Sequence, residues 1–119
     1  MVKRRPGTLF PLELDILDVG TVLQASEGSF YGFALAKRLA GPEGKLAAHG
    51  TLYKALSRMS EAGLIEEDWE DHEIAVAEGR PRRRMYRITA VGAAARNREH
   101  ARLVDEHRIA ARVADQGIA

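Results

Sequence analysis

The sequence of 119 residues contains no cysteine, which excludes disulfides, thiolate metal ligands and cysteine nucleophiles. It has no apolar run near the roughly 20 residues that cross a bilayer, and no signal-peptide pattern follows its basic start. We therefore expect a cytoplasmic protein that does not contact membranes. The formal net charge is only +1, so any attraction to nucleic acid has to come from local clusters of cations.

What the chain does contain is the composition of a globular protein, with 45% hydrophobic and 29% charged residues. Its length allows one domain with an appended helix. We predict a flexible basic arm over residues 1–8, a folded domain over 9–89, and a helix with a frayed end over 90–119.

The stretch from residue 49 to 63 is the most informative part of the chain. Leu52, Leu56 and Met59 recur at the spacing that lines one face of an α-helix, so this face is predicted to be buried. Gly63 ends the helix, because glycine readily adopts the left-handed conformation of a C-terminal cap. Alternatively, the stretch is an ordinary surface helix whose cations meet only water. The opposite face, which suits a DNA major groove, carries Thr51, Lys54, Ala55, Arg58 and Ala62.

The elements around this helix follow a characteristic order. One helix is predicted from Pro11 to residue 23 or 24, and a second from a Ser29 N-cap to a stop at residues 41–42. Residues 64–71 and 84–88 are predicted strands joined by a long arginine-rich tip. This order is typical of a helix-turn-helix followed by a wing, which is an α+β fold that is mostly α.

A final helix is predicted from about Ala90 to Asp115, with Thr89 as its cap. Large apolar residues are too few for this helix to belong to the core. Its small residues instead allow close packing against a copy of itself, so we expect a dimerisation helix.

Charges of opposite sign are separated along the predicted hairpin. The hairpin arginines could bind DNA or neutralise the acids within the protein, and we expect the first strand to turn its carboxylates away from DNA. The acids are Glu66, Glu67, Asp68, Glu70, Asp71, Glu73 and Glu78, and the arginines that follow are Arg80, Arg82, Arg83, Arg84 and Arg87.

Other side chains suggest functions that the pattern does not favour. His72, His100 and His107 are interpreted as solvated, since no three ligands converge at metal spacing. Trp69 is interpreted as a cover for the core beneath the wing, with an effector pocket as the alternative. No Ser-His-Asp set, paired carboxylates or glycine-rich phosphate loop is found, so we predict no catalytic residue, no cofactor and no metal.

Five motifs together carry a family resemblance: LELDIL at 12–17, YGFALA at 31–36, GTLYKAL at 50–56, EAGLI at 61–65 and GRPRRRMYRIT at 79–89. In their order and spacing they resemble the PadR-like transcriptional regulators. The resemblance implies a bacterial winged-helix regulator, usually a repressor, that dimerises through its C-terminal helix on a palindromic operator. It maps residues 49–62 to the recognition helix and 79–84 to the wing tip. Phe10, Ala48, His49 and Met85 depart from residues that are common in the family.

Such a fold assigns roles to the candidate residues. Lys54 and Arg58 can reach guanine O6 or N7 or a phosphate, and the Thr51 hydroxyl can reach phosphate oxygens near the helix N-terminus. Tyr53 either does the same or packs against the core. Arg80, Arg82 and Arg83 are the predicted wing contacts. The alternative function is a winged-helix module that docks another protein and has no operator. The sequence identifies neither the operator nor an effector.

Overall fold

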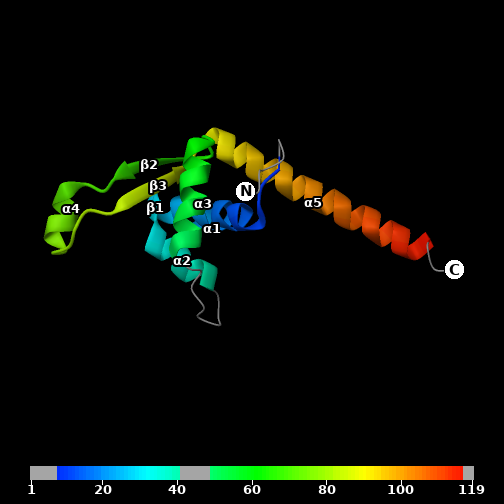
Figure 1. The fold of residues 1–119 in the computed structure, drawn as a ribbon, viewed down its shortest axis with the longest axis horizontal. Helices are drawn as coiled ribbons and strands as arrows, with labels where there is room; N and C mark the ends of the chain where they lie inside the picture. The colour runs from blue at the N-terminus through cyan, green and yellow to red at the C-terminus, as the bar shows by residue number, and fades with distance from the viewer. Residues whose placement is uncertain (1–7, 41–48, 117–119) are drawn as a thin grey trace.

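The computed structural model describes residues 8–40 and 49–116 (Figure 1). The predictions for residues 1–7 of the basic arm, for the helix stop and connection over 41–48, and for fraying over 117–119 lie outside these ranges. In chain order the elements are α1 (Pro11–Glu27), β1 (Phe30–Tyr31), α2 (Gly32–Ala40), α3 (His49–Glu61), β2 (Ile65–Trp69), α4 (His72–Ala77), β3 (Arg84–Ile88) and α5 (Ala90–Gln116).

Helix α1 lies at the centre of the domain and is longer than predicted. It begins after Phe10, whose backbone N–H donates to Glu13 Oε1 at 2.8 Å, so an acid in the first turn replaces the missing side-chain cap. It ends at Gly28, which has a φ of 84° and donates its N–H to the Gln24 carbonyl. The predicted end at residue 23 or 24 is wrong by about one turn, because only Gly28 readily adopts the left-handed conformation.

The two-residue strand β1 was not predicted. It makes the sheet three-stranded and antiparallel, with β3 between β1 and β2. Phe30 lies opposite Tyr86, and the two rings stack with their centroids 6.0 Å apart. Helix α2 therefore begins at Gly32, and the predicted N-cap at Ser29 is wrong because a strand intervenes.

The hairpin formed by β2 and β3 projects away from the helices and carries α4 at its tip (Figure 1). Strand β3 occupies the predicted range, whereas β2 is shorter than the predicted 64–71. Helix α4 replaces part of the expected irregular tip. It is capped by Asp71, whose carboxylate accepts the Glu73 N–H at 2.9 Å, and it buries Ala75.

The core forms where α1, α2, α3 and the base of the sheet meet. The prediction of a buried apolar stripe on α3 is confirmed. The buried apolar cluster consists of Ile16, Leu17, Phe30, Leu35, Ala36, Leu52, Ala55, Leu56, Met59, Leu64, Ile65, Tyr86 and Ala95.

Thr89 alone connects β3 to α5. Its hydroxyl donates to the Gly63 carbonyl at 2.6 Å and accepts the Gly92 N–H at 3.0 Å. The predicted cap of α5 is thereby confirmed, and the same side chain fastens the start of the helix to the turn that precedes β2.

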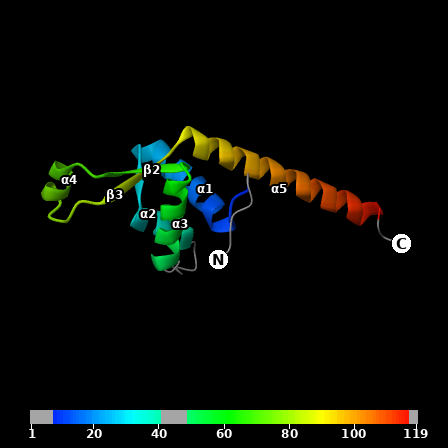
Figure 2. The same cartoon turned by 45° about the horizontal axis from the view of Figure 1, so that its top comes forward.

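Helix α5 packs on α1 only near its beginning. Asp18 Oδ1 accepts a hydrogen bond from Arg96 Nε at 2.6 Å and lies 2.7 Å from His100 Nε2. His100, which was interpreted as solvated, is still 44% exposed but also contacts Asp18 of α1. From Ala101 to Gln116 every residue is exposed, and two views show this part of α5 extending beyond the domain (Figures 1 and 2). None of the described helices is long and apolar enough to span a membrane.

Gly92→Ala tests the close approach of α5 to the sheet. A Cβ at Gly92 would lie 2.0 Å from the Leu64 backbone oxygen, so α5 would have to shift. We expect the free energy of unfolding, measured in urea by circular dichroism, to fall by about 1–3 kcal/mol.

The control is Gly50→Ala. Its Cβ would meet nothing within 4 Å, and Gly50 lies in α3, where alanine is favoured over glycine by roughly 0.5–1 kcal/mol. Equal changes of stability in the two variants would contradict the described packing.

Candidate DNA-binding surface

Helix α3 presents its cations on the face opposite the core. Thr51, Lys54 and Arg58 are exposed, in agreement with the predicted reaching face. Ala55 was assigned to the same face, but it is fully buried. It lies three residues after Leu52 and so joins the apolar stripe, which makes the exposed face narrower than predicted.

Arg58 is shared between this face and the protein interior. Its Nε lies 3.7 Å from Oε2 of Glu13, which is fully buried, and its guanidinium carbon lies 5.4 Å from the centre of the Phe10 ring. The Arg58 side chain is still 45% exposed. The pair therefore ties α3 to the start of α1 while an edge of the guanidinium stays accessible.

The pairing of Glu13 with Arg58 was not predicted from the sequence, although the spacing of residues along α1 indicates that Glu13 is buried. Glu13, Ile16, Leu17 and Gly20 are spaced by three or four residues and all are buried on α1. A lone carboxylate on such a stripe needs a partner, because a buried unpaired charge is strongly destabilising. That requirement predicts a cation nearby, and Arg58 supplies it.

Tyr53 packs against the start of α2. A Cβ at Gly32 would lie 2.4 Å from the Tyr53 hydroxyl, so the tyrosine fills space that only glycine leaves open. The residue is nevertheless 41% exposed. Its position is compatible with both roles that the sequence left open.

Arg80 is bound within the wing tip. Its guanidinium donates to both carboxylate oxygens of Glu70, at 2.6 and 2.8 Å, and to Glu78 at 2.7 Å, and only 20% of the side chain is exposed. The hydrogen bonds from Arg80 lower the pKa of Glu70 from 4.5 to about 2. The sequence left open whether the wing arginines bind DNA or neutralise acids within the protein, and Arg80 does the latter.

Arg82 and Arg83 are held less completely. Arg82 is exposed, and its Nε donates to the Glu70 carbonyl at 2.9 Å. Arg83 is half-buried, with its guanidinium carbon 3.9 Å from the centre of the Tyr31 ring, a stacking contact that leaves the donors at the guanidinium edge available.

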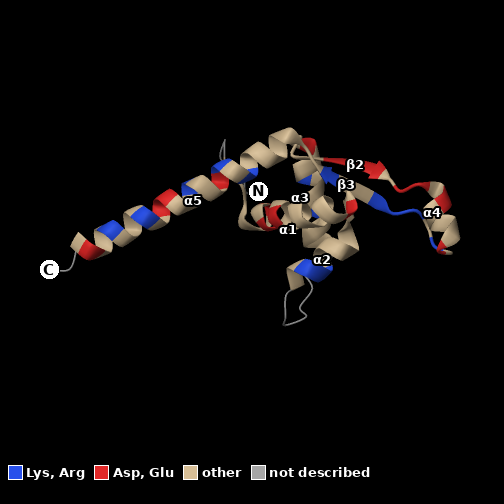
Figure 3. Cartoon of the chain, turned by 180° about the vertical axis from the view of Figure 1, so that it is seen from behind, with Lys and Arg blue, Asp and Glu red and all other residues tan. Residues whose placement is uncertain are grey.

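The sheet register sets the acidic strand β2 against the basic strand β3 (Figure 3). Glu66 lies opposite Arg87, with a nitrogen–oxygen distance of 3.6 Å. Arg84 pairs with Glu67 at 3.4 Å. The two glutamates of β2 therefore meet arginines of β3.

Trp69 is 52% exposed, so its interpretation as a cover for the core is wrong. The hairpin extends past the core at this point, and the guanidinium carbon of Arg84 lies 4.6 Å from the centre of the indole ring. The tryptophan therefore forms a cation–π pair on the wing.

Among the described residues, no group of three His, Asp or Glu side chains is placed to hold a metal ion.

Comparison with known proteins decides the family of this helix-and-wing surface. The model of the PadR-like family of transcriptional regulators matches residues 21–98, about two-thirds of the chain. The chain belongs to the PadR-like family. It is thus a transcriptional regulator of a DNA-binding family, as the five motifs indicated.

Solved structures share the fold of this PadR-like regulator at low sequence identity. A PadR-like transcription factor from Bacteroides fragilis has a TM-score of 0.69 and 19% identity, over 86% of this chain and 88% of that one. A transcriptional regulator from Clostridium thermocellum has a TM-score of 0.60 and 22% identity, over 91% and 90%. A PadR family regulator from Eggerthella lenta has a TM-score of 0.57 and 24% identity, over 91% and 88%. The search of curated proteins gave no match.

The Glu70–Arg80 pair makes the stability of this PadR-like regulator sensitive to acid. The pKa of Glu70 is about 2 in the folded protein and 4.5 without its partners. The stabilisation is therefore complete above pH 4.5 and is lost as the pH falls toward 2. We expect Glu70→Gln to be less stable than wild type at pH 6 and the difference to shrink at pH 3, as measured by urea unfolding.

Glu73→Gln is the matched control, because Glu73 is an exposed acid outside this pair. Its stability difference from wild type should change less between pH 6 and pH 3. A pH-independent difference for Glu70→Gln would show that the charge of Glu70 does not contribute to stability.

Proposed function

We propose that this regulator is a sequence-specific repressor that binds a palindromic operator in double-stranded DNA as a homodimer. The observation that carries the proposal is the position of Thr51, Lys54 and Arg58 on the exposed face of α3, whose opposite face lies in the core. A helix fixed in this way can enter a major groove without losing its packing.

Within the groove the three side chains have different chemistry. Lys54 is exposed on the middle of α3 and reads guanine O6 and N7 or a phosphate. Thr51 lies in the first turn, where backbone N–H groups and the helix dipole favour a phosphate. Glu13 holds one side of the Arg58 guanidinium, which restricts the directions in which Arg58 can reach a base.

The wing supplies backbone contacts in this proposal. Arg82 is exposed at the wing, Arg83 lies next to it, and the Tyr53 hydroxyl adds a donor near α2. Arg80 shapes the tip through Glu70 and Glu78 rather than binding DNA directly.

The DNA contacts are tested by comparing Lys54→Ala with Arg82→Ala on duplexes first selected from a random pool. Loss of a base contact at Lys54 should reduce the preference for the selected sequence over a scrambled one. Loss of a phosphate contact at Arg82 should weaken both duplexes alike and reduce the log–log salt slope by about 0.9. Fluorescence anisotropy at several salt concentrations measures both effects.

Arg87→Ala is the control, because Arg87 lies on the same hairpin and pairs with Glu66. It should change neither the preference nor the slope. Equal binding by all three variants would refute this contact map. Failure of the wild type to select any duplex would favour the protein-docking module instead.

Homodimerisation is proposed for the free part of α5. Four large apolar side chains are exposed there, at Leu103, Val104, Ile109 and Val113, and no other described element covers them. Leu103, Ile109 and Val113 fall within about 120° of the helix circumference, so two copies that pack along this face can bury them against each other. The resulting two-fold symmetry would match a palindromic operator.

We expect the double variant Leu103→Asp and Ile109→Asp to sediment as a monomer, because the charges would be buried without partners in the helix pair. Its affinity for the palindrome should fall to that for a single half-site. Asn97→Asp is the control, since Asn97 is an exposed polar residue of the same helix. A double variant that remains dimeric would exclude this interface.

Repression requires no surface beyond the DNA-binding surface and the dimer interface on α5, because a dimer bound across a promoter excludes other proteins from it. This role also places the protein with the DNA in the cytoplasm.

A further inference from the structure

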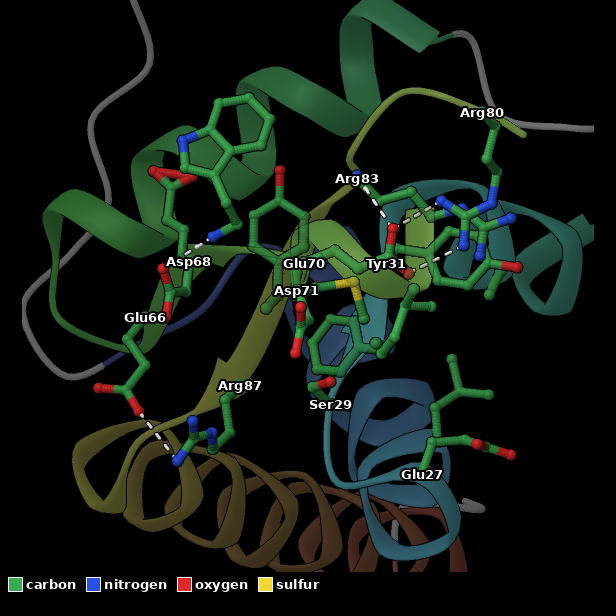
Figure 4. Close-up of a pocket in the computed structure, with 18 of the residues that line it drawn as sticks. Glu27, Ser29, Tyr31, Glu66, Asp68, Glu70, Asp71, Arg80, Arg83 and Arg87 are labelled. Carbon is green, nitrogen blue, oxygen red and sulfur yellow. Dashed lines mark hydrogen bonds and ion pairs between the residues drawn. The ribbon is translucent and has the colours of Figure 1, made fainter. Parts of the chain in front are cut away.

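A cavity of about 930 Å³ lies on the wing, facing the C-terminal end of α1 (Figure 4). Its walls come from α1, β1, α2, both strands of the hairpin and α4, and no residue of α3 lines it. The volume lies in the range of about 300–1,000 Å³ that is common for small-molecule sites. The cavity is therefore separate from the face of α3 that is proposed to enter the major groove.

Part of the cavity wall is apolar and comes from segments far apart in the sequence. Leu23 lies on α1, Ala34 on α2 and Met85 on β3. Phe30 adds the edge of its buried ring, and the half-exposed Ile74 of α4 also lines the cavity. A ligand with an apolar body would remove these surfaces from water.

The remaining wall is dominated by negative charge. Seven carboxylates and three arginines line the cavity, which gives the lining a formal charge of −4. The carboxylates belong to Glu27, Glu66, Glu67, Asp68, Glu70, Asp71 and Glu78, and the cations to Arg80, Arg83 and Arg87.

Apart from Asp71, which caps α4 by accepting the Glu73 N–H at 2.9 Å, two of these carboxylates lack a cationic partner within the described part of the chain. Glu27 is exposed at the end of α1, where the helix dipole disfavours an acid. Asp68 accepts the Trp69 N–H at 2.8 Å but forms no ion pair there. Figure 4 shows the two on opposite sides of the cavity, whereas Glu66 and Glu70 are already paired with Arg87 and Arg80.

We propose that this cavity binds a small organic cation with an apolar body, such as a primary amine on an arylalkyl chain. The apolar wall holds the body, and Glu27 or Asp68 pairs with the ammonium group. The net charge of the lining repels anions of the same shape. The proposal does not rest on DNA binding, and its test uses the protein alone.

Trp69 provides the readout, because it lines the cavity and is the single tryptophan of the chain. The full chain is titrated with 4-phenylbutylamine, 4-phenylbutan-1-ol and 4-phenylbutyrate, which have similar shapes and differ in charge. We expect a saturable fluorescence change with the amine, roughly fivefold to tenfold weaker binding of the alcohol, and no response to the carboxylate. Isothermal titration calorimetry confirms the stoichiometry.

Variants then assign the cation to the cavity. Glu27→Gln and Asp68→Asn should together reduce the affinity for the amine to that for the alcohol and leave the alcohol unaffected. Glu73→Gln and Asp15→Asn remove the same charges from exposed acids that do not line the cavity, and they should leave both affinities unchanged. Circular dichroism checks that each variant is folded.

Three results would overturn the proposal. The first is equal affinity for amine and alcohol, which would make the site purely apolar. The second is equal weakening by the cavity pair and the control pair, which would indicate general attraction to an acidic surface. The third is no saturable response to the amine at millimolar concentration.

Discussion

The pairing of Ile65 with Ile88 fixes the register of the β2–β3 hairpin, and the charges of the wing depend on that register. A slip by one residue would move every side chain to the other face of the sheet. In the observed register both glutamates of β2 meet an arginine of β3, Glu66 with Arg87 and Glu67 with Arg84. Arg82 and Arg83, at the end of the ladder, keep accessible donors. The same register leaves Asp68 without a cation beside the cavity.

Burial also determines how the cations of α3 are presented. The stripe through Leu52 and Met59 packs into the core, and the helix cannot rotate without exposing it. Glu13 adds a polar constraint, because its buried carboxylate accepts the Phe10 N–H and lies beside Arg58. Arg58 therefore both pairs with a buried acid and contributes to the exposed face of α3. Its orientation depends on α1 as much as on α3.

Periodicity and local capping predicted much of the fold. Patterns among residues a few positions apart predicted the buried face of α3, the range of β3 and the Thr89 cap. Strand β1 could not be found in this way, because two residues become a strand only beside β3. Helix α4 depends on a cap at Asp71, a residue that was expected to end a strand, and it lies in a segment that was expected to be part of the hairpin tip. Arg80 pairs with Glu70 and Arg84 with Glu67, 10 and 17 residues away. Residue types alone do not identify these partners, because several acids lie nearby in the sequence. Trp69 was misplaced because the hairpin is longer than the core beneath it.

The connection of β3 to α5 through the single residue Thr89 couples the direction of the long helix to the sheet. No flexible linker separates the sheet from the long helix, and Thr89 bonds to both the turn before β2 and the first turn of α5. Helix α5 has 27 residues and is about 40 Å long, with more than half of it beyond the domain. Arg96 and His100 also hold α5 to Asp18 of α1. The direction in which the projecting part leaves the domain is therefore set by contacts to both the sheet and α1.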